Sequence, residues 1–293
     1  MLLSPMHKQE LRYAIHPVKQ IAVLFALTII LTLCLGLFAP LLSEHQHFLQ
    51  SLSQILIFGI SSVVLAIWFY KTPLRFLQLD IRPLQHKAQW FLWVIIIMFI
   101  ATPIVDFITQ WNENLHLPEA WSAWENAMRD ADAKSQTYLT SLLEAKTISK
   151  LFLNLFVVAI LPALCEELFF RGVLQQILQR WIKNIHIAIW ITGLIFSLFH
   201  LQLLGFFPRW LLGIVLGYLF AFSHTIWIPI IAHFINNAIL VIFHYLYSIQ
   251  VLSVQPDEIS FSSSTPIVIV SAVATLFILI QCYFLHTSNT EQQ

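Results

Sequence analysis

Long apolar stretches alternate with short polar ones along most of this chain. A bilayer core about 30 Å thick is crossed by roughly 20 apolar residues in a helix. Eight stretches meet or approach that length, and each is predicted to be a membrane-crossing helix. They are residues 20–42, 52–70, 88–110, 149–179, 185–203, 209–223, 226–248 and 265–286. The predicted fold class is therefore all-α, a polytopic transmembrane bundle of about eight helices.

Composition agrees with this interpretation. The chain is 58% hydrophobic and 10% charged, with a mean hydropathy of +0.77, whereas soluble proteins carry about 25% charged residues. The formal net charge is zero, so nothing suggests a nucleic-acid partner. The first apolar run is long for a cleavable signal and lacks a small-residue cleavage site, so we expect it to be retained.

Lysine and arginine positions predict the orientation of the bundle. With eight crossings, nine of these cations fall on the side of both termini and five on the opposite side. Both termini are therefore predicted to be cytoplasmic. Because no targeting extension is visible, we expect a multi-pass protein of a bacterial inner membrane.

The stretch 111–148 is the longest polar segment. Its apolar positions, including Trp121, Trp124 and Met128, alternate with charges at a spacing that suits amphipathic helices on the membrane surface. Such a helix can serve as a lid or substrate guide, or as a plain connection. The chain is accordingly divided into 1–148, with the N-terminal helices and this loop, and 149–293, with a catalytic core and the last helix.

Charged residues at bilayer depth are costly and mark functional sites by default. The fourth stretch contains Glu166, Glu167 and Arg171. Glu167 and Arg171 are four residues apart and can pair on one helix face. Glu166 points about 100° away, so it needs another partner or a watery cavity, and it suits a general acid or base. The alternative is that all three form a helix-packing network.

Two histidines of later stretches complete the set of candidates. His200 follows Phe196 by one turn, so the phenyl ring can pack beside the imidazole. His233 and Asn237 are four apart and can donate hydrogen bonds to one oxygen. Asn236 is the neighbouring candidate. The predicted depth of His233 differs from that of Glu166 and His200, unless the preceding turn is recessed into the membrane.

Three short motifs occur in order on these stretches: EExxxR over Glu166–Arg171, FxxxH over Phe196–His200 and HxxxN over His233–Asn237. Together they resemble the CAAX prenyl endopeptidase family and its bacterial relatives, often called the CPBP or Abi family. The resemblance covers about residues 149–248. It implies an intramembrane endopeptidase acting on a peptide or protein substrate in or at the lipid bilayer.

The resemblance also implies roles for the motif residues. Glu166 and His200 would activate a water, His233 and Asn237 would hold the oxyanion, and Glu167 with Arg171 would support them. No HExxH zinc motif is present. Glu166, His200 and His233 nevertheless match the three protein ligands of a catalytic zinc or another divalent metal; otherwise no cofactor is expected.

Two other classes of function stay open at this stage. A transporter or ion-binding protein can use Glu166, His200 and His233 as a proton or metal relay, although no internal repeat is apparent. A non-catalytic membrane scaffold can retain the motifs for structure. A variant of the protease hypothesis makes Cys165 the nucleophile.

Overall fold

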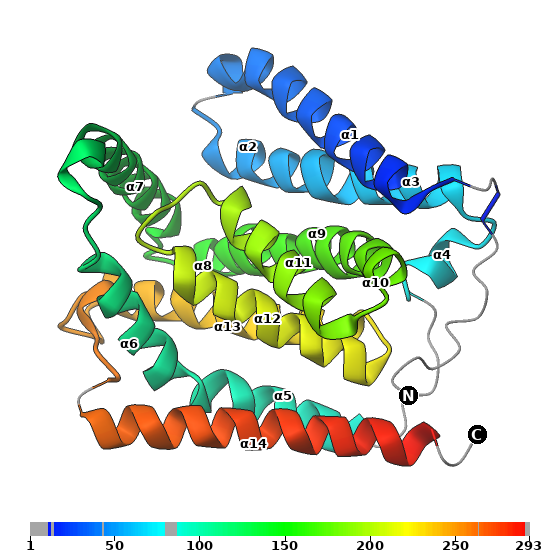
Figure 1. Cartoon of the computed structure of the whole chain (residues 1–293). Coiled ribbons are helices and arrows are strands. Elements are labelled where there is room, and N and C mark those ends of the chain that lie inside the picture. Colours follow the sequence, from blue (N-terminus) through cyan, green and yellow to red (C-terminus); the bar gives the residue numbers. More distant parts are fainter. Residues whose placement is uncertain (1–10, 13–14, 43, 80–86, 263, 291–293) are drawn as a thin grey trace.

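The computed structural model describes residues 11–12, 15–42, 44–79, 87–262 and 264–290, and its secondary structure is helical (Figure 1). Two π-helical stretches interrupt the fourth predicted segment and one interrupts the second. The α-helices are α1 Pro17–Phe38, α2 Gln46–Ser53, α3 Ser61–Phe69, α4 Pro73–Phe76, α5 Lys87–Ile100, α6 Thr102–Glu113, α7 Ser122–Leu143, α8 Ile148–Asn154, α9 Leu161–Glu167, α10 Gln176–Ile182, α11 Ile185–Phe199, α12 Phe206–Ser223, α13 Trp227–Ser248 and α14 Thr265–Thr290. The π-helical stretches are Gln54–Ile60, Leu155–Ile160 and Leu168–Gln175, and short 3-10 turns are Ala39–Leu42, Glu119–Trp121 and Pro256–Glu258.

Seven segments within the described residues are long and apolar enough to cross a membrane. They are Pro17–Leu42, Gln46–Phe69, Ala88–Glu113, Ile148–Ile182, Phe206–Ser223, Trp227–Ser248 and Thr265–Leu285. The remaining predicted crossing, the fifth, corresponds to α11, a shorter apolar helix of 15 residues. The polytopic helical bundle is therefore confirmed, and the protein is an integral membrane protein.

The predicted end of the fifth crossing at residue 203 is wrong. The helix ends at Phe199, and Leu201 has a φ of 51°, which lies outside the right-handed helical region. The chain then forms a loop before α12, which begins at Phe206 rather than at 209. His200 therefore lies in the turn at the end of α11 instead of inside a helix.

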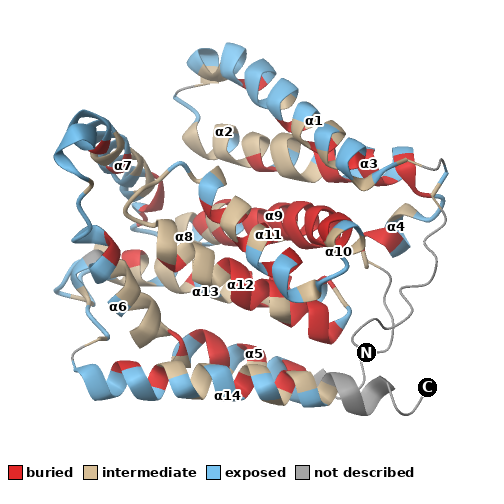
Figure 2. Ribbon diagram, in the orientation of Figure 1, coloured by how far each residue is buried: buried red, intermediate tan, exposed pale blue. Residues whose placement is uncertain are grey.

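The fourth segment, from α8 through α10, lies at the centre of the bundle (Figure 1). Its α9 and following π-helical residues are buried, whereas the outer helices α1 and α14 expose much of their surface (Figure 2). The exposed residues on these outer helices are largely apolar, for example Leu33, Leu37, Val270 and Val273. An apolar outer surface around a polar-containing centre suits acyl chains as the surroundings.

Close packing of α11 on α12 brings backbone into the centre. A Cβ atom on Gly213 would lie 2.8 Å from the Cα of Gly193, so neither glycine leaves room for a side chain. The ring of Phe196 lies at this glycine contact and packs on Phe170. Phe170 belongs to a cluster of aromatic rings that also contains Phe25, Phe58, Phe169 and Phe199. The candidate site is thus built into a tightly packed apolar interior.

Candidate active site

The three charged residues of the fourth segment are all buried, with exposed fractions of 6% for Glu166 and 0% for Glu167 and Arg171. Glu166 and Glu167 end α9, and Arg171 lies in the π-helical stretch Leu168–Gln175. Such π-helical turns are rare and are frequent at functional sites. Burial of three ionisable groups requires that each finds partners within the protein.

Glu167 and Arg171 form the predicted ion pair. Arg171 Nη1 donates to Glu167 Oε1 at 2.6 Å, and its Nη2 donates to the Gly213 carbonyl at 2.8 Å. The guanidinium also lies over the ring of Phe196, 5.1 Å from its centroid. The close approach of α11 and α12 at Gly213 therefore supplies the second acceptor that this buried cation needs.

His233 belongs to the same site. Its Nδ1 lies 2.9 Å from Glu167 Oε1, and its Nε2 lies 3.9 Å from Glu166 Oε2. Because a carboxylate oxygen accepts, Nδ1 carries the proton, and the imidazole is held with Nε2 toward Glu166. The mismatch in predicted depth does not keep His233 away from the two carboxylates.

Glu166 receives its hydrogen bond from a residue that the sequence did not single out. Gln54 Nε2 donates to Glu166 Oε1 at 3.1 Å from a π-helical stretch in the second crossing. Within the described part of the chain, Glu166 Oε2 is shielded and has no hydrogen-bond partner. One oxygen of Glu166 is therefore fixed, while the other faces His233.

His200 is held by the backbone of its own helix. Its Nδ1 lies 2.9 Å from the Phe196 carbonyl, which accepts the hydrogen bond, so Nε2 is left with a lone pair in the neutral ring. The Phe196 ring packs edge-on beside His200 at 5.0 Å and beside His233 at 5.9 Å. The predicted packing of Phe196 beside His200 is confirmed. The same ring also lies beside His233 and under the guanidinium of Arg171.

Asn237 donates from Nδ2 to the Val158 carbonyl at 3.2 Å, and its Oδ1 accepts from Asn236 at 3.2 Å. Val158 lies in the π-helical stretch Leu155–Ile160. In this arrangement the amide of Asn237 and the Nδ1 of His233 already have protein acceptors. A shared oxyanion site for His233 and Asn237 stays a prediction.

A metal site at Glu166, His200 and His233 requires their ligand atoms to converge on one point. Among the described residues, no group of three or more His, Cys, Asp or Glu side chains could hold a metal ion. His233 uses Nδ1 on Glu167, and no hydrogen bond or ion pair joins His200 to Glu166 within the described residues. The three predicted ligands therefore do not form a ready coordination site as they lie.

Cys165 is buried beside Glu166 in sequence, but its sulfur packs on Gly59 of the second crossing, 3.3 Å from where a Cβ of that glycine would lie. Of two further histidines of these helices, His224 is exposed at the end of α12 and His244 is buried in α13.

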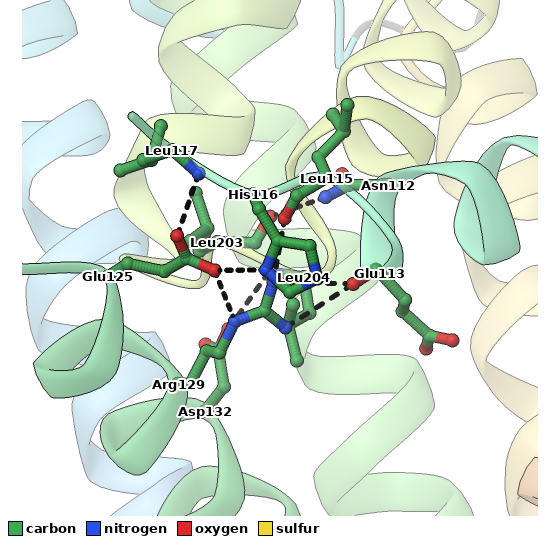
Figure 3. Close-up of polar contacts among 10 residues, drawn as sticks. All are labelled: Asn112, Glu113, Leu115, His116, Leu117, Glu125, Arg129, Asp132, Leu203 and Leu204. Atoms are coloured by element: carbon green, nitrogen blue, oxygen red, sulfur yellow. Dashed lines mark hydrogen bonds and ion pairs between the residues drawn. The ribbon is translucent and has the colours of Figure 1, made fainter. Parts of the chain in front are cut away.

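The polar stretch 111–148 contains α7, and this helix contacts the loop that follows His200 (Figure 3). Asp132 Oδ2 accepts from the backbone N–H of Leu204 at 2.9 Å. Asn112 of α6 donates to the Leu203 carbonyl at 2.9 Å and accepts from the N–H of Phe207 at 3.0 Å. These bonds fix the loop between α11 and α12, so the predicted surface helix borders the candidate site.

The entrance to α7 is held by a second set of contacts, also drawn in Figure 3. Glu125 accepts from the Leu117 N–H at 2.7 Å, from Arg129 at 2.8 Å and from His116 at 2.9 Å. The backbone N–H of Leu117, followed by the Arg129 and His116 hydrogen bonds, lowers the pKa of Glu125 to about 2. The turn between α6 and α7 is therefore anchored on an ionised carboxylate.

Fold and site together define a polytopic helical membrane protein with a buried acid–base cluster at its centre. Residues 148–239 match the family model of type II CAAX prenyl endopeptidases, Rce1-like, which confirms the resemblance predicted from the three motifs over this segment.

Part of the chain is also similar to a curated bacterial protein. The uncharacterised protein YpbD of Bacillus subtilis (strain 168) is 32% identical over 93 residues, which is 29% of this chain. The match spans 43% of YpbD, less than half of its length. No solved structure matches this chain.

Proposed function

We propose that the chain is an intramembrane endopeptidase that hydrolyses a peptide bond of a membrane or membrane-apposed substrate. The observation that carries the proposal is the buried pair of Glu166 Oε2 and His233 Nε2, 3.9 Å apart, with the carboxylate oxygen lacking a hydrogen-bond partner among the described residues. The family match over residues 148–239 supports the same reaction class.

In the proposed reaction Glu166 acts as the general base. It takes one proton from a water whose oxygen bonds to the scissile carbonyl carbon. The free Nε2 of His200 accepts a hydrogen bond from the other O–H of that water, which stays intact. When the carbon–nitrogen bond breaks, Glu166 returns its proton to the leaving nitrogen. Gln54 keeps one oxygen of Glu166 fixed throughout.

The carbonyl oxygen gains negative charge in the first step and needs donors. His233 in its doubly protonated form can donate from Nε2 while Glu167 holds Nδ1. Asn237 would join it by exchanging the Val158 carbonyl for the substrate oxygen, because catalytic hydrogen bonds often tighten only when substrate is bound. Arg171 supports this arrangement by balancing the charge of Glu167.

The decisive experiment compares wild type with Glu166→Gln in nanodiscs, using a library of membrane peptides and mass spectrometry. Loss of general acid–base catalysis predicts a rate lower by about 10²–10⁴-fold. Cys165→Ala is the matched control on the neighbouring residue, and its activity should equal that of wild type. Proton flux that depends on Glu166, with no cleavage by the wild type, would refute the protease in favour of a transporter.

A chelator added to active wild type separates the two schemes of water activation. Because the described residues do not assemble three ligands, we expect activity to be retained. Loss of activity on chelation, with recovery on adding zinc or another divalent metal, would instead require Glu166, His200 and His233 to move together.

We further propose that both termini lie in the cytoplasm of a bacterial cell. The cation distribution supports this orientation, and the match to a Bacillus subtilis protein supports a bacterial setting. A cysteine introduced at the exposed residue Glu119, just before α7, should react with an impermeant reagent added outside the inner membrane. Reaction only after permeabilisation would reverse the orientation.

A further inference from the structure

A small cavity, here named the Arg209 cavity, lies between α5, α6, α12, α13 and α14. Its volume is about 240 Å³, and its lining includes Ala101, where the third crossing breaks between α5 and α6. The walls are mainly apolar. Four polar side chains from four helices also line it: Thr102 of α6, Arg209 of α12, Asn236 of α13 and Thr275 of α14.

Arg209 is the first unexplained feature of this cavity. Within the described residues, its side chain makes no hydrogen bond or ion pair, and its Nη1 is shielded from the surroundings. The guanidinium packs over Gly205, where the absent side chain leaves room for it. A half-buried cation without a direct contact is costly in a membrane interior, so a ligand is the natural expectation.

The hydroxyl group of Thr275 is the second unexplained feature of the cavity. Hydroxyl groups in apolar helices usually bond to the carbonyl four residues earlier, as Thr28, Thr102 and Thr192 do here. In contrast, the shielded Oγ1 of Thr275 has no partner among the described residues. Two residues from separate helices therefore line one cavity, and each has a shielded polar atom with no partner in the described part of the chain.

Among the described residues, no carboxylate makes direct contact with the guanidinium of Arg209. Asp132 and Glu166 act on Arg209 through space, and Arg209 acts on His200 in the same way. Asp132 Oδ2 accepts from the Leu204 N–H and Glu166 Oε1 accepts from Gln54, while Asp132 Oδ1 and Glu166 Oε2 have no hydrogen-bond partner within the described residues. The hydrogen-bond donors of Arg209 stay available beside the candidate active site.

We propose that the Arg209 cavity binds a carboxylate group carried on an apolar residue or acyl chain. The guanidinium fork matches a carboxylate, the Thr275 hydroxyl supplies a further donor, and the apolar walls take the attached hydrocarbon. The volume lies below the range of about 300–1,000 Å³ for drug-sized ligands, so it holds one end of a molecule. That end is either the terminus of a peptide or a membrane fatty acid.

The test measures binding rather than turnover, so it goes beyond the proposed function and is independent of it. Full-length protein in nanodiscs is titrated calorimetrically with N-acetyl-leucine and its amide, and with decanoate and decanol, against empty nanodiscs. At least one carboxylate should bind about 10-fold or more tighter than its neutral partner. Selective binding of N-acetyl-leucine identifies a peptide terminus, and selective binding of decanoate identifies a fatty acid.

Variants locate the binding at the cavity. Arg209→Gln should weaken carboxylate binding by about 10–100-fold, and Thr275→Val by a few-fold, while neutral partners are unaffected. Lys146→Gln, which removes a cation whose side chain is 75% exposed, is the control and should bind as wild type does.

Two results would overturn the proposal. One is equal binding of each carboxylate and its neutral partner by the wild type. The other is undiminished carboxylate binding by both variants. If Arg209→Gln does not fold, Arg209→Lys keeps the charge and loses the fork, and unchanged binding by it together with Thr275→Val has the same meaning.

Discussion

Replacing Arg171 by Met tests whether the buried ion pair holds the centre of the bundle. The guanidinium is fully buried, donates to Glu167 and to the Gly213 carbonyl, and lies over Phe196. Methionine fills much of the volume but supplies no donor. The substitution leaves a buried carboxylate short of one partner and removes the side-chain donor to the Gly213 carbonyl.

The magnitude follows from this loss. Removing one member of a buried, hydrogen-bonded ion pair costs about 3–5 kcal/mol, because the remaining charge is left uncompensated. At roughly 2–4 °C per kcal/mol for a chain of this size class, the melting temperature should fall by roughly 6–20 °C. The double variant Glu167→Gln with Arg171→Met removes both charges and should recover much of this loss, since a neutral glutamine oxygen can still accept from His233.

The assay is thermal unfolding in detergent, followed by intrinsic tryptophan fluorescence. Lys146→Met, at a side chain that is 75% exposed, serves as the control for loss of a cation and should melt as the wild type does. A melting temperature of Arg171→Met within about 2 °C of the wild type, which lies below the expected range, would show that the ion pair does not stabilise the bundle. A double variant that melts lower than both single variants would also contradict the prediction, because the charges would then be unrelated.

Three further predictions concern contacts around the site. Gln54→Leu removes the donor to Glu166 and should lower kcat/KM by about 10–100-fold, measured by peptide cleavage, with near-normal melting. Asp132→Ala should speed hydrogen exchange of the Leu204 amide; unchanged exchange would show that this bond does not hold the loop. The Leu117 N–H is the first cause of the low pKa of Glu125, about 2 against an ordinary 4.5. The anchoring of α7 is therefore present above pH 4.5 and lost as pH falls toward 2, a dependence that Glu125→Gln should abolish in pH-resolved hydrogen exchange.

The bundle could be predicted from apolar length alone, and the ion pair from residue spacing. Glu167 and Arg171 are close because neighbours four residues apart share a helix face, and the π-helical turns do not separate them. The end of the fifth crossing could not be predicted in this way. Leu203 and Leu204 continue an apolar run, but tertiary hydrogen bonds to Asn112 and Asp132 hold their backbone in a loop.

The contact of Gln54 with Glu166 could not be predicted from the sequence. Gln54 is uncharged and lies near the start of an apolar run, so its sequence position suggests an ordinary interfacial residue. Its contact with Glu166 spans 112 residues and depends on the packing of the second crossing against α9. No local spacing rule relates two residues that far apart, and Gln54 lies outside the segment matched by the family model.

The charges of the buried cluster explain why His233 is part of it. Glu166, Glu167 and Arg171 together would leave one uncompensated negative charge in an apolar interior, which is strongly unfavourable. One proton shared between Glu166 and His233 makes the cluster neutral, whether it resides on the carboxylate or on Nε2 of the imidazole. Moving that proton across the pair changes no net charge, so the apolar surroundings oppose the transfer little. The residues that make the cluster tolerable inside the membrane are therefore the ones that equip it for acid–base chemistry.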